Sequence, residues 1–345
     1  MEQAYDILKN HAYADLPDPP ELEYGMIRGM VQAFGDPYTR FEEPAQHELS
    51  TDQLEGEYGG IGSTLEHNPE GFIILHPFPE GPASKAGVLD GDRLIKVDNT
   101  NIVNYMPMNE VVAALRGPEG EKVAIEILRL PENTIYPFSI KRENLPLPSV
   151  TWHLDSVESW IGIIQVNLIA ASTVDEIQNA VHDLRSHGAT HFVLDLRGNG
   201  GGLLTQGIDI TRLFLQEGTV IQEHFRNQDI KTYKVNKPGR FAEIPLVVLV
   251  NKDTARAAEI IAGALKVQNR AHIIGTQTFG KDSIQLVFSL QDGASLHVTA
   301  AKWWIPGLEF PIGDGGLEPD VLVSTEDVPG DAYIQAAIQD FLIQP

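Results

Sequence analysis

Residues 246–265 read LVVLVNKDTARAAEIIAGAL, and this stretch decides the fold class. Its first five residues, Leu246–Val250, are all apolar, which is typical of a strand buried on both faces. Residues 255–265 predict the helix that follows this strand. The same order recurs upstream, where strands and a helix are predicted at residues 161–166, 191–196 and 173–187. Strands that alternate with helices predict a layered α/β core.

The composition is that of an acidic globular protein. Its 345 residues are enough for two or three domains, and 42% are hydrophobic and 21% charged. The formal net charge of −23 argues against nucleic acid as a partner, because phosphate binding needs clustered Lys and Arg. The absence of cysteine excludes disulfides, thiolate metal sites and cysteine nucleophiles. The 11 histidines lack a metal-ligand spacing, so we expect neither a metal site nor a cofactor.

Two sequence patterns bear on the compartment of the protein. No run of about 18 apolar residues occurs, so we expect no transmembrane segment. Residues 1–6 read MEQAYD and lack the basic region and apolar stretch of a signal peptide. The chain opens within an amphipathic helical pattern, which favours a start after a removed signal and leaves a cytoplasmic location open.

Composition and turn signals divide the chain into three parts. Residues 1–54 predict a helical segment with apolar stripes, which we expect to pack on a neighbour as a cap. Residues 55–143 predict a small β-rich module with Gly and Asp turns. Residues 144–345 hold the α/β core, and a Pro-rich linker, LPLP at residues 145–148, joins it to the module. The stripes of the helical segment consist of Ala4, Ile7 and Leu8, and of Leu22, Met26, Met30, Val31 and Phe34.

The β-rich module carries a specific string, AGVLDGDRLI at residues 86–95. This string resembles a PDZ domain of the circularly permuted bacterial type, with a helix at 109–115 and a strand at 123–128. Such a domain binds peptide C-termini by strand addition, and backbone amides capture the carboxylate. The preceding loop matches the carboxylate-binding loop, and glycine lets the backbone approach closely there. The loop consists of Gly59, Gly60, Ile61 and Gly62.

Motifs along nearly the whole chain resemble the carboxy-terminal processing peptidases, serine peptidases with a Ser-Lys catalytic pair. The strongest are DLRGNGGG at residues 195–202 and GTQTFGKDSIQ at residues 275–285. The helical segment contains DPYT at residues 36–39, and closing motifs lie at 299–304 and 316–321. The resemblance implies an α/β fold with a spiral ββα core of the ClpP and crotonase-like type and an inserted PDZ domain. It also implies an extracytoplasmic location.

The resemblance implies a role for several residues. Lys281 occupies the position of the general base, and Gln285 that of the glutamine that orients it. A lysine acts as a base only if burial or a nearby cation lowers its pKa. The oxyanion hole would use backbone N–H groups of Gly201 or Gly202 and of Ala257.

Arg256 occupies the position of the nucleophile. The family reads Gly-Ser-Ala-Ser-Ala-x-Glu at this point, whereas this chain reads DTARAAE at residues 253–259. A guanidinium stays protonated and has no nucleophilic lone pair, so it cannot replace a serine hydroxyl. We therefore expect absent or impaired proteolysis. Asp253 and Thr254 also depart from the family string, which favours natural divergence over an engineered knockout. Asp253 lies three residues before Arg256 and could pair with it.

Two alternatives remain open from the sequence. An active endopeptidase would use Lys281 with a displaced nucleophile, either Thr254 or Ser283. A hydrophobic-ligand binder would share the core fold and line a cleft with apolar residues, although we expect those residues in the core. They are Trp303, Trp304, Ile305 and Phe310. The peptide preference and the oligomeric state do not follow from the sequence.

Overall fold

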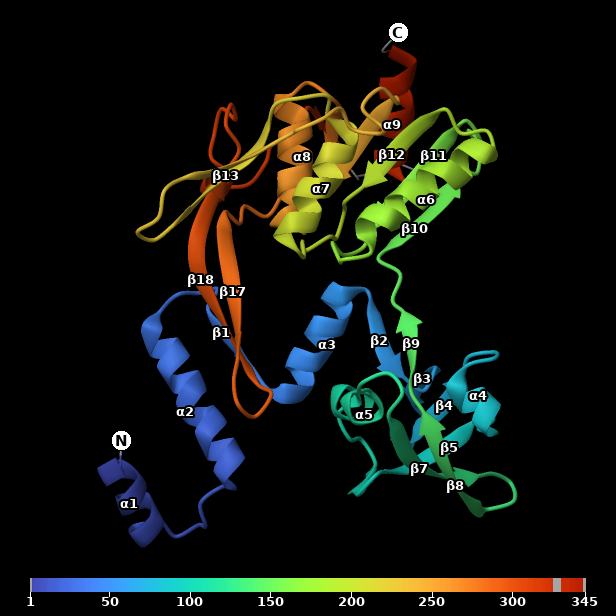
Figure 1. Ribbon diagram of the computed structural model, residues 1–345, viewed down its shortest axis with the longest axis vertical. Coiled ribbons are helices and arrows are strands. Elements are labelled where there is room, and N and C mark those ends of the chain that lie inside the picture. The colour runs from blue at the N-terminus through green and yellow to red at the C-terminus, as the bar shows by residue number, and fades with distance from the viewer. Residues whose placement is uncertain (1, 325–329, 344–345) are drawn as a thin grey trace.

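The computed structural model describes residues 2–324 and 330–343, which form a helical segment, a β-rich module and a larger α/β core (Figure 1). The N-terminal segment contains three helices and one short strand. They are α1 (Glu2–His11), α2 (Pro19–Phe34), β1 (Arg40–Glu42) and α3 (Pro44–Glu55). Proline opens both α2 and α3, where its fixed φ and missing N–H suit the first helical turn.

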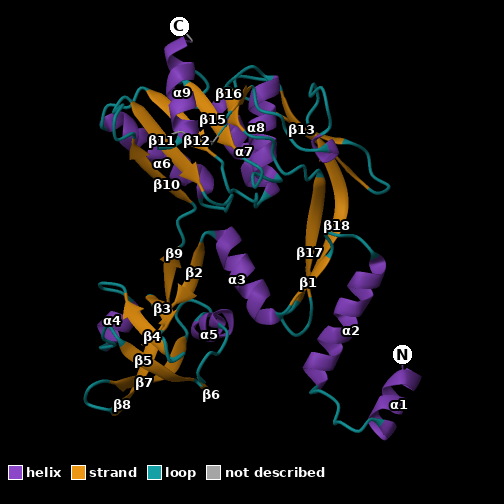
Figure 2. Ribbon diagram, turned by 180° about the vertical axis from the view of Figure 1, so that it is seen from behind, coloured by secondary structure: helices purple, strands orange, loops and turns teal. Residues whose placement is uncertain are grey.

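The expected packing of the helical segment holds only in part. The α2 helix touches β1, and the rings of Tyr24 and Phe41 lie 5.2 Å apart. No residue of α2 is buried, however, and Ile7 of α1 and Phe34 of α2 are 53% and 67% exposed. Both ribbon views show α1 and α2 standing away from the core (Figures 1 and 2). The expectation that the apolar stripes pack on a neighbour is therefore wrong for this chain by itself.

The β-rich module forms around its own apolar core, which includes Leu75, Val111 and Ile127. Its main sheet has the order β3-β4-β5-β7-β8, with β6 paired to β5, while β2 pairs with β9. The helix and strand expected at 109–115 and 123–128 are present as α5 and β7. The elements are β2 (Glu57–Gly60), β3 (Ser63–His67), β4 (Ile73–Pro77), α4 (Pro82–Ala86), β5 (Asp92–Val97), β6 (Thr100–Asn101), α5 (Met108–Leu115), β7 (Lys122–Arg129), β8 (Thr134–Lys141) and β9 (Glu143–Pro146).

The core is built on a six-stranded sheet of order β10-β11-β12-β15-β16-β19, parallel except for β10. Side chains alternate across it. Leu194 and Val248 pack with α6, α7 and α8, whereas Val193 and Leu249 pack with α9 on the other face. The predicted α/β class is confirmed. The elements are β10 (Val150–Leu154), β11 (Ile161–Val166), α6 (Thr173–Ser186), β12 (His191–Asp195), α7 (Leu204–Phe214), β15 (Leu246–Val250), α8 (Ala257–Val267), β16 (His272–Gly275), the 3-10 turn η1 (Ile312–Asp314), β19 (Val321–Leu322) and α9 (Ala332–Ile343).

A second sheet of the core carries a long hairpin, which we call the arm. The arm consists of β17 (Ser283–Ser289) and β18 (Ser295–Trp304), and it reaches away from the core toward the N-terminal segment (Figure 1). There β1 pairs antiparallel with the start of β18, on the edge opposite β17. Further along the same edge, β18 pairs with β13 (Thr219–Phe225), which in turn pairs with β14 (Lys231–Lys234). The arm therefore joins segments that lie far apart in the sequence.

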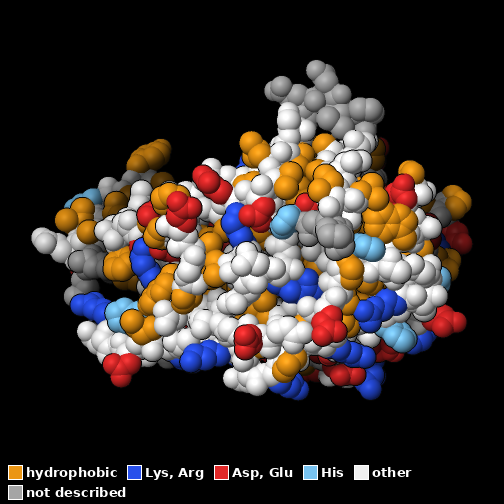
Figure 3. Space-filling view, turned by 90° about the horizontal axis from the view of Figure 1, so that it is seen from above, with side chains coloured by type: hydrophobic (Ala, Val, Ile, Leu, Met, Phe, Trp, Pro, Cys, Tyr) orange, Lys and Arg blue, Asp and Glu red, His pale blue; other side chains and the backbone are white. Residues whose placement is uncertain are grey.

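The face drawn in Figure 3 mixes acidic and basic side chains, so the negative net charge is not gathered there in one patch. Among the residues described, no helix has the length and apolar character needed to cross a membrane.

The turn after β12 is held by close backbone contacts. Ile169 N–H donates to Gly201 O at 2.9 Å, and Leu203 N–H donates to Ile169 O at 2.8 Å. Gly202 has a φ of +146°, and a Cβ added to it would lie 2.1 Å from Ile169 O. Only glycine fits this position, because both the backbone conformation and the space exclude a side chain.

Replacement of Gly202 by Ala should lower the free energy of unfolding by about 1–3 kcal/mol or more, since strain and collision add. Gly200→Ala is the matched control, because a Cβ at Gly200 would meet nothing within 4 Å. Urea denaturation followed by circular dichroism measures both variants. Equal stability of the two variants would contradict the account of this turn.

Candidate active site

Arg256 lies at a sharp turn between β15 and α8. Its φ of 55° and ψ of −118° place a non-glycine residue in a sparsely populated, strained region. A strained strand-to-helix turn of this kind exposes the nucleophile at the top of the sheet in serine hydrolases. Gly201 lies against the turn, and a Cβ added to Gly201 would come within 2.8 Å of the Arg256 Cβ. The backbone that presents a nucleophile is thus intact although the side chain is not one.

The fully buried carboxylate of Glu259 holds this turn in place. Its Oε2 accepts the Arg256 N–H at 2.9 Å and the Lys281 N–H at 3.0 Å. Its Oε1 accepts the Thr278 hydroxyl at 2.6 Å and the Gly280 N–H at 2.7 Å. Burial raises the pKa of Glu259, and these hydrogen bonds oppose the rise. Sequence reasoning gave Glu259 no role, although an acid three residues after a helix start signals a cap.

Lys281 is buried beside the turn, with 2% of its surface exposed. Its Nζ donates to Gln285 Oε1 at 3.2 Å and lies 4.0 Å from the centre of the Tyr38 ring. Burial lowers the pKa of Lys281 to about 8, and the positive charges of Arg256 and Arg40 add to the effect. A large share of the amine is therefore neutral near pH 8, as a general base requires.

The N-terminal segment completes the surroundings of Lys281. Gln285 Nε2 donates to the backbone carbonyl of Tyr38, and Arg40 Nη1 donates to Gln285 Oε1 at 3.5 Å. Asp36, at the turn before β1, opposes the lowering of the Lys281 pKa. Sequence reasoning missed Tyr38 and Arg40, because nothing in a single sequence connects them with residues about 245 positions away.

The Arg256 side chain folds toward the glycine turn. Its Nη1 donates to Gly200 O at 3.3 Å, while its buried Nε has no hydrogen-bond partner in the described residues. Burial lowers the pKa of Arg256, and the charge of Arg40 adds to this effect. The expected pairing with Asp253 is wrong, since no ion pair joins the two in the described part of the chain.

Arg256 lines a cleft of about 410 Å³ between the core, the arm and α3. Three parts of the chain thus contribute walls, and Lys281 lies behind the lining, bonded to Gln285 of the arm. The lining also includes Arg40, Leu54, Gly200, Gly201, Gly202, Ala257, Ser283, Gln285, His297 and Trp303.

The glycine turn and the start of α8 supply the expected backbone donors. Gly201 N–H already donates to Asn199 Oδ1 at 2.8 Å, so it is not free for an oxyanion. Gly202 N–H and Ala257 N–H have no acceptor among the described residues. Of the backbone N–H groups expected to bind an oxyanion, those of Gly202 and Ala257 remain candidates. The N–H of Gly201 is used within the turn.

The two hydroxyls proposed as displaced nucleophiles differ in position. Thr254 is fully buried, donates to Leu196 O at 2.8 Å and accepts from Asn251 N–H at 3.0 Å, so the backbone occupies its hydroxyl. Ser283 lines the cleft, and its buried Oγ has no partner in the described residues. Neither hydroxyl is hydrogen-bonded to Lys281 Nζ in that part of the chain.

Of the four apolar residues considered for ligand binding, two are core residues, while Trp304 is half-buried and belongs to no core cluster of the described residues. Trp303 and Ile305 are 3% and 4% exposed and belong to the main core cluster, as expected. Phe310 is 64% exposed, so the expectation is wrong at that position. Trp303 also lines the cleft, but many of the other lining side chains are charged or polar, so the cleft is not an apolar ligand pocket.

The β-rich module contains a separate groove of about 300 Å³ between β3 and α5. The Gly-rich loop forms one end of it, and Met108 and Val112 of α5 form a side. The N–H groups of Ile61 and Gly62 donate to no acceptor in the described residues. An apolar groove that ends at free backbone N–H groups has the form of a site for a peptide carboxylate.

Comparison with known proteins identifies a peptidase family and a PDZ domain in the chain. Residues 160–323 match the model of peptidase family S41, and residues 77–129 match that of the PDZ domain. The chain is 34% identical over 337 residues to the carboxy-terminal processing protease CtpA of Bacillus subtilis, covering 97% of this chain and 71% of that protein. It is 35% identical over 329 residues to the carboxyl-terminal-processing protease of Synechocystis sp., covering 92% and 76%.

Solved structures give the same result. The photosystem II D1 C-terminal processing protease matches with a TM-score of 0.51 at 28% identity, covering 96% of this chain and 90% of that one. A putative S41 protease from Bacteroides fragilis has the same TM-score at 16% identity and supports the fold alone. Fold and site therefore define an S41-type serine peptidase scaffold with a PDZ domain. The chain belongs to the carboxy-terminal processing protease family, which confirms the resemblance drawn from its motifs.

The altered pKa of Lys281 can be measured directly. We expect its side chain to titrate near 8, and we expect Arg256→Ala to raise this pKa because one of the causes is removed. NMR of lysine labelled with carbon-13 at Cε reports the titration, and Lys281→Met assigns the signal. Arg240→Ala, at an exposed position, is the matched control. An ordinary lysine pKa of about 10.4 in the unmodified protein would contradict the account.

Proposed function

We propose that this protein is a member of the carboxy-terminal processing protease family that recognises peptide or protein C-termini and has absent or severely impaired proteolysis. The observation that carries this proposal is Arg256 at the strained turn where the family places its nucleophile. A guanidinium cannot attack a carbonyl, since its nitrogen lone pairs are delocalised and the group stays protonated. It also occupies part of the cleft beside the glycine turn.

The rest of the catalytic arrangement supports an origin in an active enzyme. Lys281 has a lowered pKa and a hydrogen bond to Gln285, and the N–H groups of Gly202 and Ala257 have no acceptor within residues 2–324 and 330–343. When a nucleophile is removed from such a site, only binding and oxyanion stabilisation remain to accelerate the reaction. Restoring the hydroxyl is therefore the decisive test.

Arg256→Ser should create turnover of a fluorogenic peptide that the unmodified protein lacks. Replacement of Lys281 by Ala in this variant should remove about 100-fold or more of the rate, as expected for a general base. The rate should rise as the pH rises through the pKa of Lys281, because only the neutral amine accepts a proton. The midpoint should lie above about 8, since the cation at residue 256 is gone.

A second variant covers the case in which activity requires more than the single change at residue 256. It combines Asp253→Gly, Thr254→Ser and Arg256→Ser, which restores the family string at all three altered positions. Turnover by the unmodified protein that Lys281→Ala abolishes would overturn the proposal. If neither revertant gains activity, Arg256 is not the cause of the inactivity.

The second candidate function is an active endopeptidase with Ser283 as a displaced nucleophile. It is favoured by one observation, the unpartnered Ser283 hydroxyl in the wall of the cleft. This candidate predicts that the unmodified protein turns over peptide and that Ser283→Ala and Lys281→Ala each abolish the turnover. Thr254 has no comparable support, because its hydroxyl is bound to the backbone.

C-terminal recognition is expected in the groove of the PDZ domain. A fluorescent peptide with an apolar last residue and a free carboxylate should bind the full chain, and its C-terminally amidated form should bind at least about 10-fold more weakly. Val112→Glu should weaken binding, because Val112 lines the groove. Asn109→Glu adds the same charge to an exposed position of α5 outside the lining, so it should have little effect. Equal binding of the two peptides would contradict the proposal.

We also propose that the protein acts outside the cytoplasm. The support is its family resemblance, and the absence of cysteine is compatible with such a compartment. Fractionation of cells that express the full-length protein tests this proposal.

A further inference from the structure

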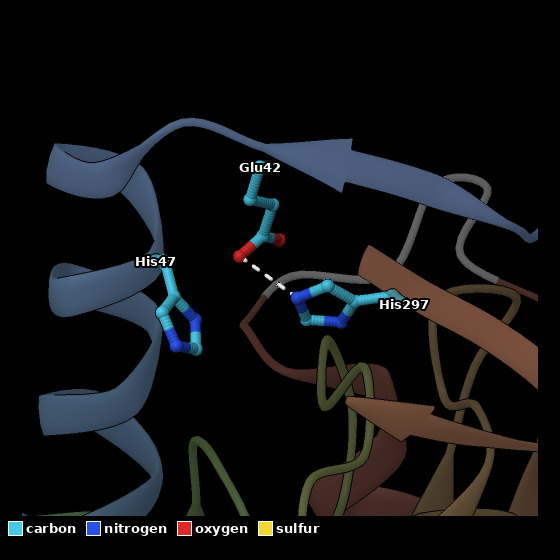
Figure 4. Close-up of side chains that lie close together, drawn as sticks. All are labelled: Glu42, His47 and His297. Carbon is cyan, nitrogen blue, oxygen red and sulfur yellow. Dashed lines mark ion pairs between the residues drawn. The ribbon is translucent and has the colours of Figure 1, made fainter. Parts of the chain in front are cut away.

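Glu42, His47 and His297 form a cluster at the junction between the N-terminal segment and the arm (Figure 4). Glu42 comes from β1, His47 from the beginning of α3 and His297 from β18. In the antiparallel pairing of β1 with β18, Glu42 lies opposite Ser295. Glu42 and His297 are thus diagonal neighbours, and residues at this spacing on paired strands share a face of the sheet.

The cluster has the composition and the spacing of a metal site. One potential ligand atom from each side chain lies within 4.8 Å of the other two. Two imidazoles and one carboxylate are a zinc donor set, and tetrahedral geometry at bond lengths of about 2.0–2.1 Å places ligand atoms about 3.3 Å apart. The three groups therefore need to close by only about 1–1.5 Å, which rotation of flexible side chains allows.

Glu42 and His297 are buried and His47 is half-buried, and their polar atoms are incompletely paired. Glu42 is 8% exposed and His297 6% exposed. Glu42 Oε2 lies 3.0 Å from His297 Nε2, an ion pair only when the ring is protonated. Apart from this contact, Glu42 Oε2 and His47 Nδ1 have no hydrogen-bond partner in the described residues. A buried polar atom without a partner is costly, which points to a ligand that occupies the space between them.

Contacts with neighbouring residues orient the three side chains of this cluster. Arg40 Nε donates to the other oxygen of Glu42, Oε1, at 2.9 Å, which orients the carboxylate with Oε2 toward the histidines. The Ser295 hydroxyl is hydrogen-bonded to His297 Nε2 at 3.2 Å, and the Ser289 hydroxyl to His47 Nε2 at 3.5 Å. An ion bound at His297 Nε2 would replace the first of these hydrogen bonds.

We propose that Glu42, His47 and His297 bind one divalent transition-metal ion, of which Zn²⁺ fits the donor set best, and that the ion fastens β1 and α3 to the arm. The fourth position is open to water or to the Ser295 hydroxyl. This proposal does not depend on whether the protein is a peptidase.

The site is connected to the candidate base by a short chain of contacts. Glu42 holds Arg40 at 2.9 Å, Arg40 reaches Gln285 Oε1 at 3.5 Å, and Gln285 accepts from Lys281 Nζ at 3.2 Å. An ion bound to Glu42 would therefore lie next to Arg40, whose positive charge contributes to the lowered pKa of Lys281. Metal binding fastens the same segment that supplies Tyr38 and Arg40 to the active-site cleft.

The test uses the full chain without an affinity tag, stripped of metal, and titrated with Zn²⁺ in competition with a chromophoric chelator. We expect one equivalent to bind with a micromolar or lower dissociation constant. Glu42→Gln, His47→Gln and His297→Gln should each weaken binding at least about 10-fold, since each removes one of three ligands. His76→Ala is the matched control, because His76 also pairs with carboxylates, those of Glu66 and Asp90, but lies in the PDZ domain.

Absence of saturable binding, or full binding in all three ligand variants, would overturn the proposal. A second measurement tests the site in the unmodified protein, so that the proposal can still be judged if a ligand variant does not fold. Co²⁺ added to the unmodified protein should give the visible bands of a four- or five-coordinate nitrogen and oxygen site, and one equivalent of Zn²⁺ should remove them. Zn²⁺ should also raise the melting temperature of the unmodified protein and of His76→Ala, but not that of His47→Gln. Octahedral, water-like Co²⁺ spectra would count against the site.

Discussion

The buried carboxylate of Glu259 is the interaction on which the active-site region depends. An ionised or polar group without water is tolerated only when hydrogen bonds satisfy it, and this one accepts four. Two of the donors are backbone N–H groups of Arg256 and Lys281, which belong to different elements. One side chain therefore fixes the distance and the orientation between the nucleophile position and the base position. Because the contacts are to backbone, they hold whatever side chain stands at residue 256.

The cleft is assembled from parts of the chain that lie far apart in the sequence. The core supplies the glycine turn and α8, the arm supplies Gln285 and Ser283, and the N-terminal segment supplies Arg40 and α3. The α3 helix also contacts α5 of the PDZ domain, where Arg116 pairs with Asp52 at 2.6 Å. Peptide groove and cleft are thus linked through a single helix. Displacement of the N-terminal segment would alter both sites, because it forms a wall of one and adjoins the other.

The sequence predicted the fold well, because the fold rests on local patterns, and the residues it proposed for the site follow from equally local motifs. The apolar strand at residues 246–250 and the glycine turn are recognisable from a few consecutive residues, and the string around Lys281 is specific. Contacts between distant segments were not predictable. Tyr38 and Arg40 reach Lys281 and Gln285 through the pairing of β1 with the arm, which leaves no periodic signal. The cluster of Glu42, His47 and His297 was also not predictable, because its members come together through the same strand pairing and follow no sequence motif. The exposure of α1 and α2 was also missed, since an amphipathic pattern shows that a face is apolar but not what covers it.

The positive φ of Arg256 has a consequence for how this site changes over time. The strained conformation is held by hydrogen bonds from Glu259 to the backbone and by the glycine packed against the turn. These contacts do not use the side chain at residue 256, so the turn can persist with different side chains there, each at its own cost in stability. A single substitution would therefore place a hydroxyl on a turn that is already formed.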